Sequence, residues 1–268
     1  MTAIRAFQIH AFTSTVFGGN PAGVCLLDTW PTDTVLARIA HDFGPSVTAF
    51  VGPGEGTHRL RWFTRGEHEV MGFCGHATFA AAHAVLHEVG ADALQFDTVT
   101  GMRPAALVDG GISMGIPCWS NSLAGAPEGL EPALRATPSS VHRSERDWIA
   151  LFDTPEEVAA LAPDYDVMRA FGHSAVIATA SSGTDIVFRF FCPGFSIGEQ
   201  EDPATGSAIS ALGPFWYARL RQASLRFTQL SARGAAFRAT VAGDAVTLLS
   251  QCVTFSRGWL DLPDIAAT

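Results

Sequence analysis

The chain has 268 residues, of which 47% are hydrophobic and 16% are charged, so it can bury a core and is not a disordered segment. All 17 basic residues are arginine, which excludes chemistry that needs a lysine amine, such as pyridoxal-phosphate attachment or the lysine of a phosphate-binding loop. The 26 acidic residues bring the net charge to −9, which argues against nucleic acid as a partner.

The cysteines and the hydropathy pattern bear on the compartment. Five cysteines form no CxxC pair and are odd in number, as is typical of reduced thiols in a cytoplasm. No stretch approaches the roughly 20 apolar residues that a membrane-spanning helix needs, and the first residues lack the apolar core of a signal peptide. We therefore expect a cytoplasmic protein that makes no use of a membrane.

The first half of the chain has the pattern of a β-sheet with two helices. Apolar residues recur at helical spacing from Val35 to Phe43, before a Gly-Pro pair that predicts the end of that helix. Residues 75–90 are rich in alanine and end on Gly90, so we expect a second helix whose small side chains are buried against the sheet. Apolar patterns predict strands over residues 4–11, 22–27, 47–51 and 59–64.

A second round of similar elements follows residues 117–146. That segment holds four prolines, several serines and little periodicity, which is typical of a connection. We therefore expect an N-terminal domain over residues 1–116 and a C-terminal domain over residues 117–268, with the alternative that the last strand returns to the first domain. The later patterns predict strands over 148–152, 174–180, 185–191 and from 225 to 250, and helices over 154–163 and 204–220.

The two small-residue helices open on similar glycines, Gly75 and Gly206, which lie about half the chain apart. A duplicated domain would bring the two helix N-termini together at a cleft between the copies. The unpaired N–H groups of a helix N-terminus attract an anion, and glycine lets a carboxylate approach the backbone closely. The alternative interpretation is that these glycines only cap the helices and ease their packing against a sheet.

Two residues at the start of the first helix can carry acid–base chemistry. His76 lies in the first turn, where the helix dipole favours a neutral imidazole that exchanges protons near pH 7. Cys74 directly precedes the helix, where a thiolate is stabilised. The alternatives are that His76 is an exposed polar residue at a helix start and that Cys74 is a small buried residue.

The segment before the second helix supplies a carboxylate and a hydroxyl. Asp202 follows the sequence EQE and precedes a proline that fixes the turn, so it is the best placed of three acids to point toward a ligand, and the other two can simply be solvated. Ser207 can donate its hydroxyl to a ligand oxygen. A serine nucleophile is disfavoured because GSAIS contains neither the GxSxG motif nor a nearby histidine.

The sequence gives no support for a metal or a nucleotide cofactor. His83 and His87 lie four residues apart on the alanine-rich helix, but position 84 is alanine where the zinc-protease motif requires glutamate. No cysteine and histidine cluster has zinc-ligand spacing, and no GxGxxG follows a strand. We expect chemistry without a cofactor.

Five segments of the chain resemble, in order, the signatures of the PhzF-like phenazine-biosynthesis family, and EDPATGSA is the most specific sequence among them. The resemblance covers nearly the whole chain. It implies an α+β protein with the diaminopimelate-epimerase-like fold, in which two similar domains each wrap a curled, barrel-like sheet around a central helix and the active site lies between the domains. The segments are residues 12–27, 46–51, 74–86, 188–208 and 229–237.

The resemblance also implies roles for individual residues. It makes His76 and Asp202 catalytic, and we add Cys74 as a third candidate for proton transfer. It further implies a small-molecule carboxylate substrate, no cofactor and a homodimer. The implied substrate-binding residues are Asn20, Ser46, Gly75, Ala77, Gly206 and Ser207.

One position departs from the family pattern. The phenazine isomerase has its general base, a glutamate, in a segment similar to SETAFV, and this chain has Val47 at that position. A valine cannot move a proton, so another group must do so: Cys74 is one candidate, and the neighbouring acids and histidine are others. Related racemases use paired cysteines at the two helix starts, but Thr205 fills the second such position. The other candidates are Glu67, His68 and Glu69.

These observations favour an isomerase that moves a proton within a small carboxylate-bearing metabolite, in secondary metabolism such as antibiotic biosynthesis. The alternative within enzymes is a lyase, cyclase or hydrolase that acts on a related metabolite through a changed mechanism. A non-catalytic protein that binds a small molecule is the alternative outside enzymes.

Overall fold

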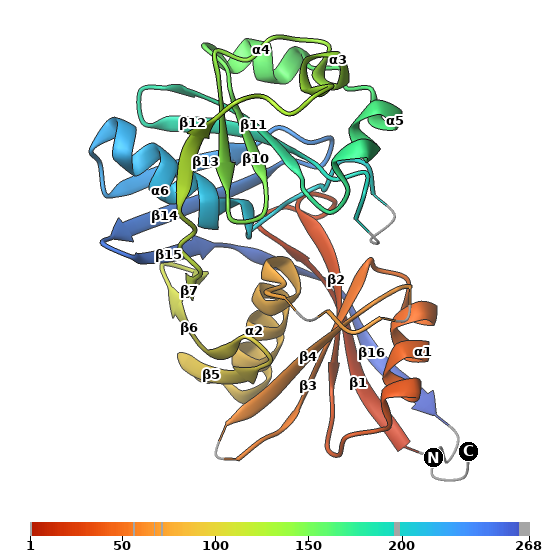
Figure 1. The fold of residues 1–268 in the computed structure, drawn as a ribbon. Helices are drawn as coiled ribbons and strands as arrows, with labels where there is room; N and C mark the ends of the chain where they lie inside the picture. Colours follow the sequence, from red (N-terminus) through yellow and green to blue (C-terminus); the bar gives the residue numbers. More distant parts are fainter. Residues whose placement is uncertain (1, 56, 67, 71, 196–198, 263–268) are drawn as a thin grey trace. The chain divides into compact units, whose positions relative to one another are not determined.

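The protein folds as two units, each a curled sheet with a helix inside it (Figure 1). The first unit contains residues 1–115 and 249–268, and the second contains residues 116–248. The computed structural model describes residues 2–55, 57–66, 68–70, 72–195 and 199–262.

The first unit contains an eight-stranded sheet in the order β16-β1-β2-β3-β4-β5-β6-β7. Neighbouring strands are antiparallel except β2 with β3 and β4 with β5, which are parallel and are joined through α1 and α2. The elements are β1 (Thr2–Ala11), β2 (Asn20–Leu26), α1 (Asp33–Phe43), β3 (Val47–Pro53), β4 (His58–Thr64), α2 (Gly75–Val89), β5 (Ala93–Thr98), β6 (Gly101–Val108), β7 (Gly111–Ile116) and β16 (Cys252–Leu262).

The sheet of the first unit is covered on both faces in its central strands. Helix α1 packs on β3 and β4, whereas α2 contacts β1, β2, β3, β5, β6 and β16, so that the sheet curls around α2. Strand β3 is buried at every residue from Val47 to Gly52, as expected when helices lie on both sides of a strand. On the α1 face, Phe50 and Phe63 pack with Leu36 and Ile39 of the helix.

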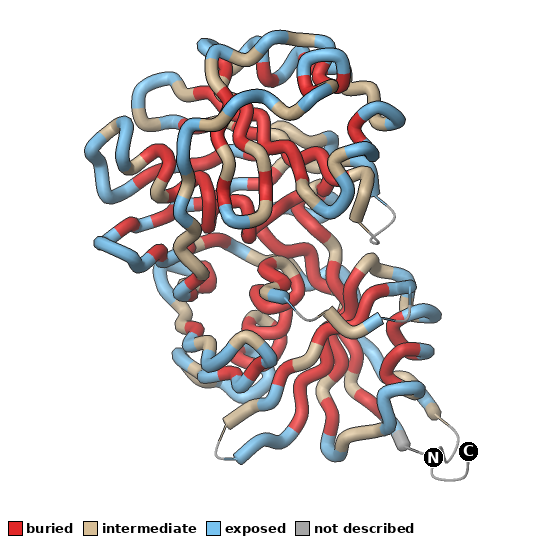
Figure 2. The backbone as a smooth tube through the Cα atoms, viewed as in Figure 1, coloured by how far each residue is buried: buried red, intermediate tan, exposed pale blue. Residues whose placement is uncertain are grey.

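Helix α2 is buried on almost every side, as the alanine-rich sequence predicts. Ten of its 15 residues are buried, and its backbone is largely red in Figure 2. Small side chains let strands approach the helix from several directions, because each alanine adds only one carbon atom beyond the backbone. The helix ends where expected, with Gly90 in the left-handed conformation and its N–H donating to the Leu86 carbonyl.

The second unit repeats this plan. Its strands follow the order β15-β14-β13-β12-β11-β10-β9-β8, and the parallel pairs β10 with β11 and β12 with β13 are again joined by helical connections. The elements are β8 (Asn121–Ala124), α3 (Leu130–Leu134), β9 (Ser140–Ser144), β10 (Trp148–Leu151), α4 (Pro155–Ala160), α5 (Tyr165–Met168), the 3₁₀ turn η1 (Arg169–Phe171), β11 (Val176–Ser182), β12 (Asp185–Phe191), α6 (Ala208–Leu220), β13 (Ser224–Gln229), β14 (Ala235–Ala242) and β15 (Ala245–Ser250).

Helix α6 is the counterpart of α2 and packs on β8, β13 and β14. Strand β14 alternates strictly between buried and exposed residues, because α6 covers one of its faces and solvent covers the other. Strand β11 is buried at five consecutive residues, because α4 packs on it as well. The α6 helix begins at Ala208 rather than at residue 204, since residues 205–210 first form i to i+3 hydrogen bonds.

The interpretation of residues 117–146 as a connection is wrong. This segment contains β8, α3 and β9, and Leu130, Ala133 and Leu134 of α3 are fully buried in the core of the second unit. The elements are only four or five residues long, so none of them is long enough to show a recognisable hydrophobic period.

Among the described residues, none of the helices combines the length and the apolar composition required to cross a bilayer.

The enclosure of α2 can be tested by enlarging a buried side chain. Ala81 is fully buried, so Ala81→Leu should lower the free energy of unfolding by about 1–3 kcal/mol through overpacking. Urea denaturation followed by circular dichroism measures the change. Val89 of the same helix is 65% exposed, so Val89→Leu serves as the control, and equal midpoints for the two variants would contradict the enclosed position of α2.

Candidate active site

The candidate residues of the first unit gather at the start of α2. Cys74 is the N-cap residue in an extended conformation, and its side chain makes no capping hydrogen bond. Its carbonyl accepts from the Thr78 N–H at 3.1 Å and from the Thr78 hydroxyl at 2.6 Å. Gly75 and Ala77, which are predicted to bind substrate, lie in the first turn and are buried. The backbone N–H groups of this turn are the ones that a helix leaves without a partner inside itself.

His76 and Cys74 form a pair in this first turn. The Cys74 Sγ lies 3.8 Å from the His76 Nδ1, and Cys74 is 8% exposed. The other ring nitrogen of His76, Nε2, is buried without a hydrogen-bond partner in the described part of the chain. Burial lowers the pKa of His76 to about 4, because a charged ring loses its hydration there. The imidazole is therefore neutral at pH 7 and can accept a proton.

The remaining predicted residues of the first unit lie on neighbouring strands. Asn20 opens β2 and is 2% exposed. Ser46 lies directly before β3 and is half-buried, and its carbonyl accepts from the Arg65 N–H at 2.9 Å. Val47 opens β3 and is 2% exposed, so the position of the family glutamate is filled by a buried apolar side chain.

The structure separates the candidates for the missing base. Both carboxylate oxygens of Glu69 accept hydrogen bonds from Arg61, at 2.6 and 2.7 Å, and Arg61 also binds Asp33 at 2.7 Å. Glu69 is thus held in an ion-pair network. His68 is exposed, and Glu67 lies outside the described residues. Cys74 is the candidate for which the structure records a contact with His76.

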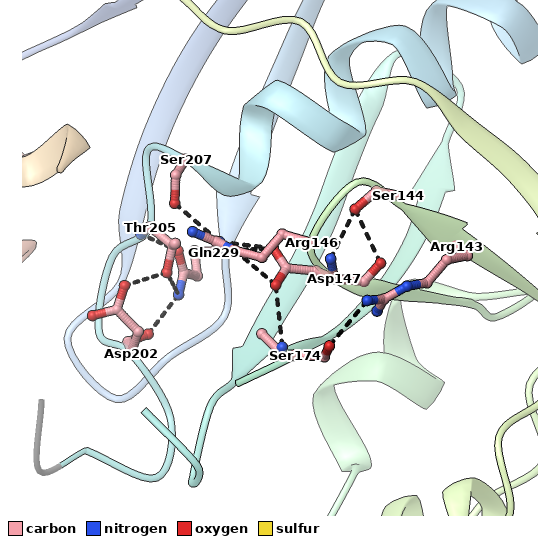
Figure 3. Close-up of polar contacts among 10 residues, drawn as sticks. Arg143, Ser144, Arg146, Asp147, Ser174, Asp202, Thr205, Ser207 and Gln229 are labelled. Atoms are coloured by element: carbon pink, nitrogen blue, oxygen red, sulfur yellow. Dashed lines mark hydrogen bonds and ion pairs between the residues drawn. The ribbon is translucent and has the colours of Figure 1, made fainter. Parts of the chain in front are cut away.

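The candidate carboxylate of the second unit is fixed by its neighbours. Asp202 is 8% exposed, and its side chain accepts a hydrogen bond from the Thr205 hydroxyl. The amide of Gln229, which is fully buried, donates to the Asp202 carbonyl at 2.6 Å and accepts from the Thr205 N–H at 2.7 Å. Figure 3 shows Gln229 next to Thr205, with dashed lines for its hydrogen bonds to Thr205 and Asp202. This bridge sets the shape of the turn that carries Asp202.

Ser207 lies at the start of α6 beside a guanidinium group. Ser207 is the N-cap residue of α6, but its side chain makes no capping hydrogen bond. The preceding residue, Gly206, is buried. The Arg146 Nη2 donates to the Ser207 Oγ at 3.3 Å. Arg146 in turn binds Asp147, which is fully buried, with contacts of 2.7 to 3.0 Å.

Sequence reasoning missed four residues of these clusters. Thr205 and Gln229 lie within the segments on which the family resemblance rests. The resemblance therefore indicates that these positions matter, but it does not indicate which hydrogen bonds the two residues make. Arg146 is the last residue of the segment 117–146, for which the composition predicts a connection, and Asp147 directly follows it. The hydrogen bond from Arg146 to Ser207 spans 61 residues of sequence, and no local pattern indicates a contact of that range.

The histidine pair of α2 has a packing role. The rings of His83 and His87 meet edge to face with centroids 4.3 Å apart, and the His83 Nε2 hydrogen-bonds with Thr254 at 3.0 Å. Burial, followed by the charge of His87, lowers the pKa of His83 to about 4. Within the described residues, no group of three or more His, Cys, Asp or Glu side chains is placed to hold a metal ion.

Comparisons with known proteins agree on one family. The model of the family described as phenazine biosynthesis-like protein, PhzC-PhzF, matches residues 9–251. The uncharacterized isomerase PA2770 of Pseudomonas aeruginosa is 35% identical, over 97% of this chain and 99% of that protein. A PhzF-family protein of Enterococcus faecalis has a similar crystal structure, with a TM-score of 0.90 and 30% identity over 97% of this chain and 100% of that one.

The fold likeness extends beyond the family. A hydroxyproline epimerase from Agrobacterium vitis aligns with a TM-score of 0.59 over 98% of this chain and 94% of its own, at 11% identity. The predicted fold, two curled sheets around central helices as in the epimerases, is confirmed, and so is the prediction of an enzyme of the isomerase class. The chain therefore belongs to the phenazine biosynthesis-like (PhzC-PhzF) family.

Proposed function

We propose that the protein is a cofactor-independent isomerase that moves a proton within a small carboxylate-bearing metabolite of secondary metabolism. The environment of His76 carries this proposal: its Nε2 is buried without a partner among the described residues, and its Nδ1 lies 3.8 Å from the Cys74 sulfur. An imidazole kept neutral in this way can take a proton and return it, which is what an isomerase requires.

The proposed reaction leaves the atomic composition of the substrate unchanged. The His76 Nε2 accepts a proton from a substrate carbon, and the electron pair left behind shifts a double bond within the molecule. The imidazolium then returns a proton to another carbon, which regenerates the enzyme. Cys74 lies on the Nδ1 side of the ring. Its thiol can take part in proton transfer there, a role that the valine at position 47 cannot fill. Asp202 serves the same reaction as a second proton-transfer group.

The proposed substrate-binding residues are those that can donate hydrogen bonds to the acidic group of the substrate or that match the family pattern. The Ser207 hydroxyl and the backbone at the starts of the two buried helices are suited to a carboxylate, because their N–H and O–H groups are hydrogen-bond donors. We include Asn20, Ser46, Gly75, Ala77 and Gly206 among the substrate-binding residues on the strength of the family pattern. A homodimer in the cytoplasm is part of the same proposal.

A changed reaction is the second candidate, and Val47 is the observation that favours it. A lyase, cyclase or hydrolase could use the same His76 and Asp202 once the glutamate is absent. The mass of the product distinguishes the candidates, because isomerisation leaves it unchanged, whereas elimination or hydrolysis alters it. Binding of a metabolite without turnover would indicate the non-catalytic alternative.

Loss of either proposed proton-transfer residue should abolish most of the activity. We expect His76→Ala and Asp202→Asn to lower the rate of deuterium incorporation by about 10²–10⁴-fold, because each removes a positioned acid or base. The assay incubates the protein with a panel of small unsaturated hydroxy and amino acids in deuterated water and reads label by mass spectrometry. His173 is exposed, so His173→Ala is the control, and unchanged incorporation by the first two variants would refute their roles.

The pH profile should follow the neutral state of His76. Since burial lowers its pKa to about 4, the rate should stay level from pH 7 to about pH 5 and fall near pH 4, whereas an ordinary histidine would lose activity below about pH 6.5. Stability should follow the same ring. The unfolded chain binds a proton near pH 6.5 and the folded chain only near pH 4, so the free energy of unfolding decreases as pH falls through this window.

An NMR titration of the His76 ring, assigned with His76→Gln, measures the pKa directly. Circular dichroism at each pH verifies that the protein is still folded. A midpoint near 6.5 would show that the ring is not held neutral by burial.

The Thr205 hydroxyl should position Asp202. Thr205→Val keeps the shape of the side chain but removes the donor to the carboxylate, so we expect the maximal exchange rate to fall roughly tenfold, the value of one hydrogen bond to a charged group. Thr205→Ser keeps the donor and should retain the rate. Equal rates for the two variants would exclude this positioning role.

A further inference from the structure

Arg146 is held in one orientation by a carboxylate and by aromatic rings. It lies in the turn between β9 and β10, and its guanidinium donates from Nε to both Asp147 carboxylate oxygens at 2.9 and 3.0 Å and from Nη2 to Oδ2 at 2.7 Å. The guanidinium carbon also lies near three ring centroids, those of Trp119 at 4.8 Å, Phe195 at 5.4 Å and Phe190 at 5.6 Å.

Asp147 is itself fixed on all sides. It is fully buried, its Oδ1 also accepts from the Ala175 N–H at 3.1 Å, and its backbone N–H and carbonyl both bond with the Ser144 hydroxyl at 3.0 Å. The guanidinium therefore has little freedom to rotate, and Figure 3 shows it extended toward Ser207. A donor that is held in place in this way loses little entropy when it binds a ligand.

The contact with Ser207 determines which way the serine proton can point. A guanidinium only donates, so the Ser207 Oγ is the acceptor in the 3.3 Å contact. The serine's own proton has no acceptor among the described residues. The Nη1 group of Arg146 also has no partner in that part of the chain, and the Arg146 side chain is 32% exposed. Two donors, one on each residue, are thus available side by side.

We propose that Arg146 is a substrate-binding residue that, together with the Ser207 hydroxyl, recognises a carboxylate of the substrate. The Arg146 Nη1 donates to one carboxylate oxygen and Ser207 donates to the same group. This inference rests on the proposed function for the acidic nature of the substrate. It adds that an arginine side chain, and not the helix backbone alone, selects the acid.

The neighbouring Arg143 illustrates a purely structural arginine. It also stacks on a ring, that of Trp148 at 4.7 Å, and it donates to the Ser174 hydroxyl at 3.1 Å. Its Nη1, however, is buried without a partner, whereas the Arg146 Nη1 is not among the buried polar atoms. Figure 3 shows Arg143 directed to Ser174 and not to Ser207. Arg143 therefore provides a matched control in the same unit.

The test compares benzoate with benzamide, which has the same shape but no charge. Binding is measured by NMR titration of the ¹⁵N-labelled full chain, including the Arg146 side-chain N–H signal, without any turnover. We expect Arg146→Lys to weaken benzoate binding roughly tenfold, because lysine lacks the fixed planar fork, and Ser207→Ala to weaken it similarly. Benzamide affinity should stay the same in every variant, and Arg143→Lys should bind benzoate like the unaltered protein.

A double variant controls for the possibility that substitution of Arg146 alone prevents folding. Removal of Arg146 alone would leave Asp147 buried and unpaired, so the pair Arg146→Gln with Asp147→Asn keeps a neutral hydrogen-bonded contact and should also lose benzoate affinity. Benzoate affinity within twofold of the unaltered protein in both Arg146 variants would overturn the inference, as would failure of the unaltered protein to bind benzoate. Failure of the isomerase proposal would instead appear as absent deuterium exchange while benzoate discrimination persists.

Discussion

The chemistry of each unit depends on a helix that is enclosed by its own sheet. Helices α2 and α6 are buried along most of their length, and the alanines of α2 let several strands pack close to that helix. The enclosure reaches the helix start, where Cys74, Gly75 and the Nε2 atom of His76 are buried. Polar groups placed there lose their hydration and must find partners or change their protonation state. The residues that precede and open these two helices are therefore subject to this constraint.

The two helix starts respond to this constraint in different ways. In the first unit, desolvation acts on a base: the pKa of His76 falls to about 4, and the ring stays neutral next to the weakly polar Cys74 thiol. In the second unit, an acid is retained by hydrogen bonds, since Asp202 accepts from Thr205 and its turn is bridged by the buried Gln229. The first unit thus holds a neutral acceptor and the second a hydrogen-bonded acid, and each is a kind of group that can transfer a proton.

Prediction from sequence succeeded where a feature is local and repeated. The alanine run of α2 and its terminal Gly90 specify a buried helix and its end, and the helix-opening glycines mark the positions of His76 and Ser207. It failed over residues 117–146, because three short elements produce no period. It also missed Arg146, whose contacts with Trp119, Phe190 and Ser207 form only when segments that are distant in sequence fold together. The hydrophobic periodicity of the sequence predicts which residues are buried, but it does not predict which polar side chains contact one another.

The replacement of the family glutamate by Val47 has a consequence for the kind of base that can operate. Val47 is 2% exposed, and a carboxylate at so buried a position would need a partner to stay charged. One acid proposed as its replacement, Glu69, is bound through both oxygens to Arg61, and withdrawing it would leave that guanidinium without its bidentate partner. The pair of Cys74 and His76 has neither problem, because both groups are stable in neutral form when desolvated. A neutral thiol or imidazole therefore costs less to bury at such a position than an unpaired carboxylate does.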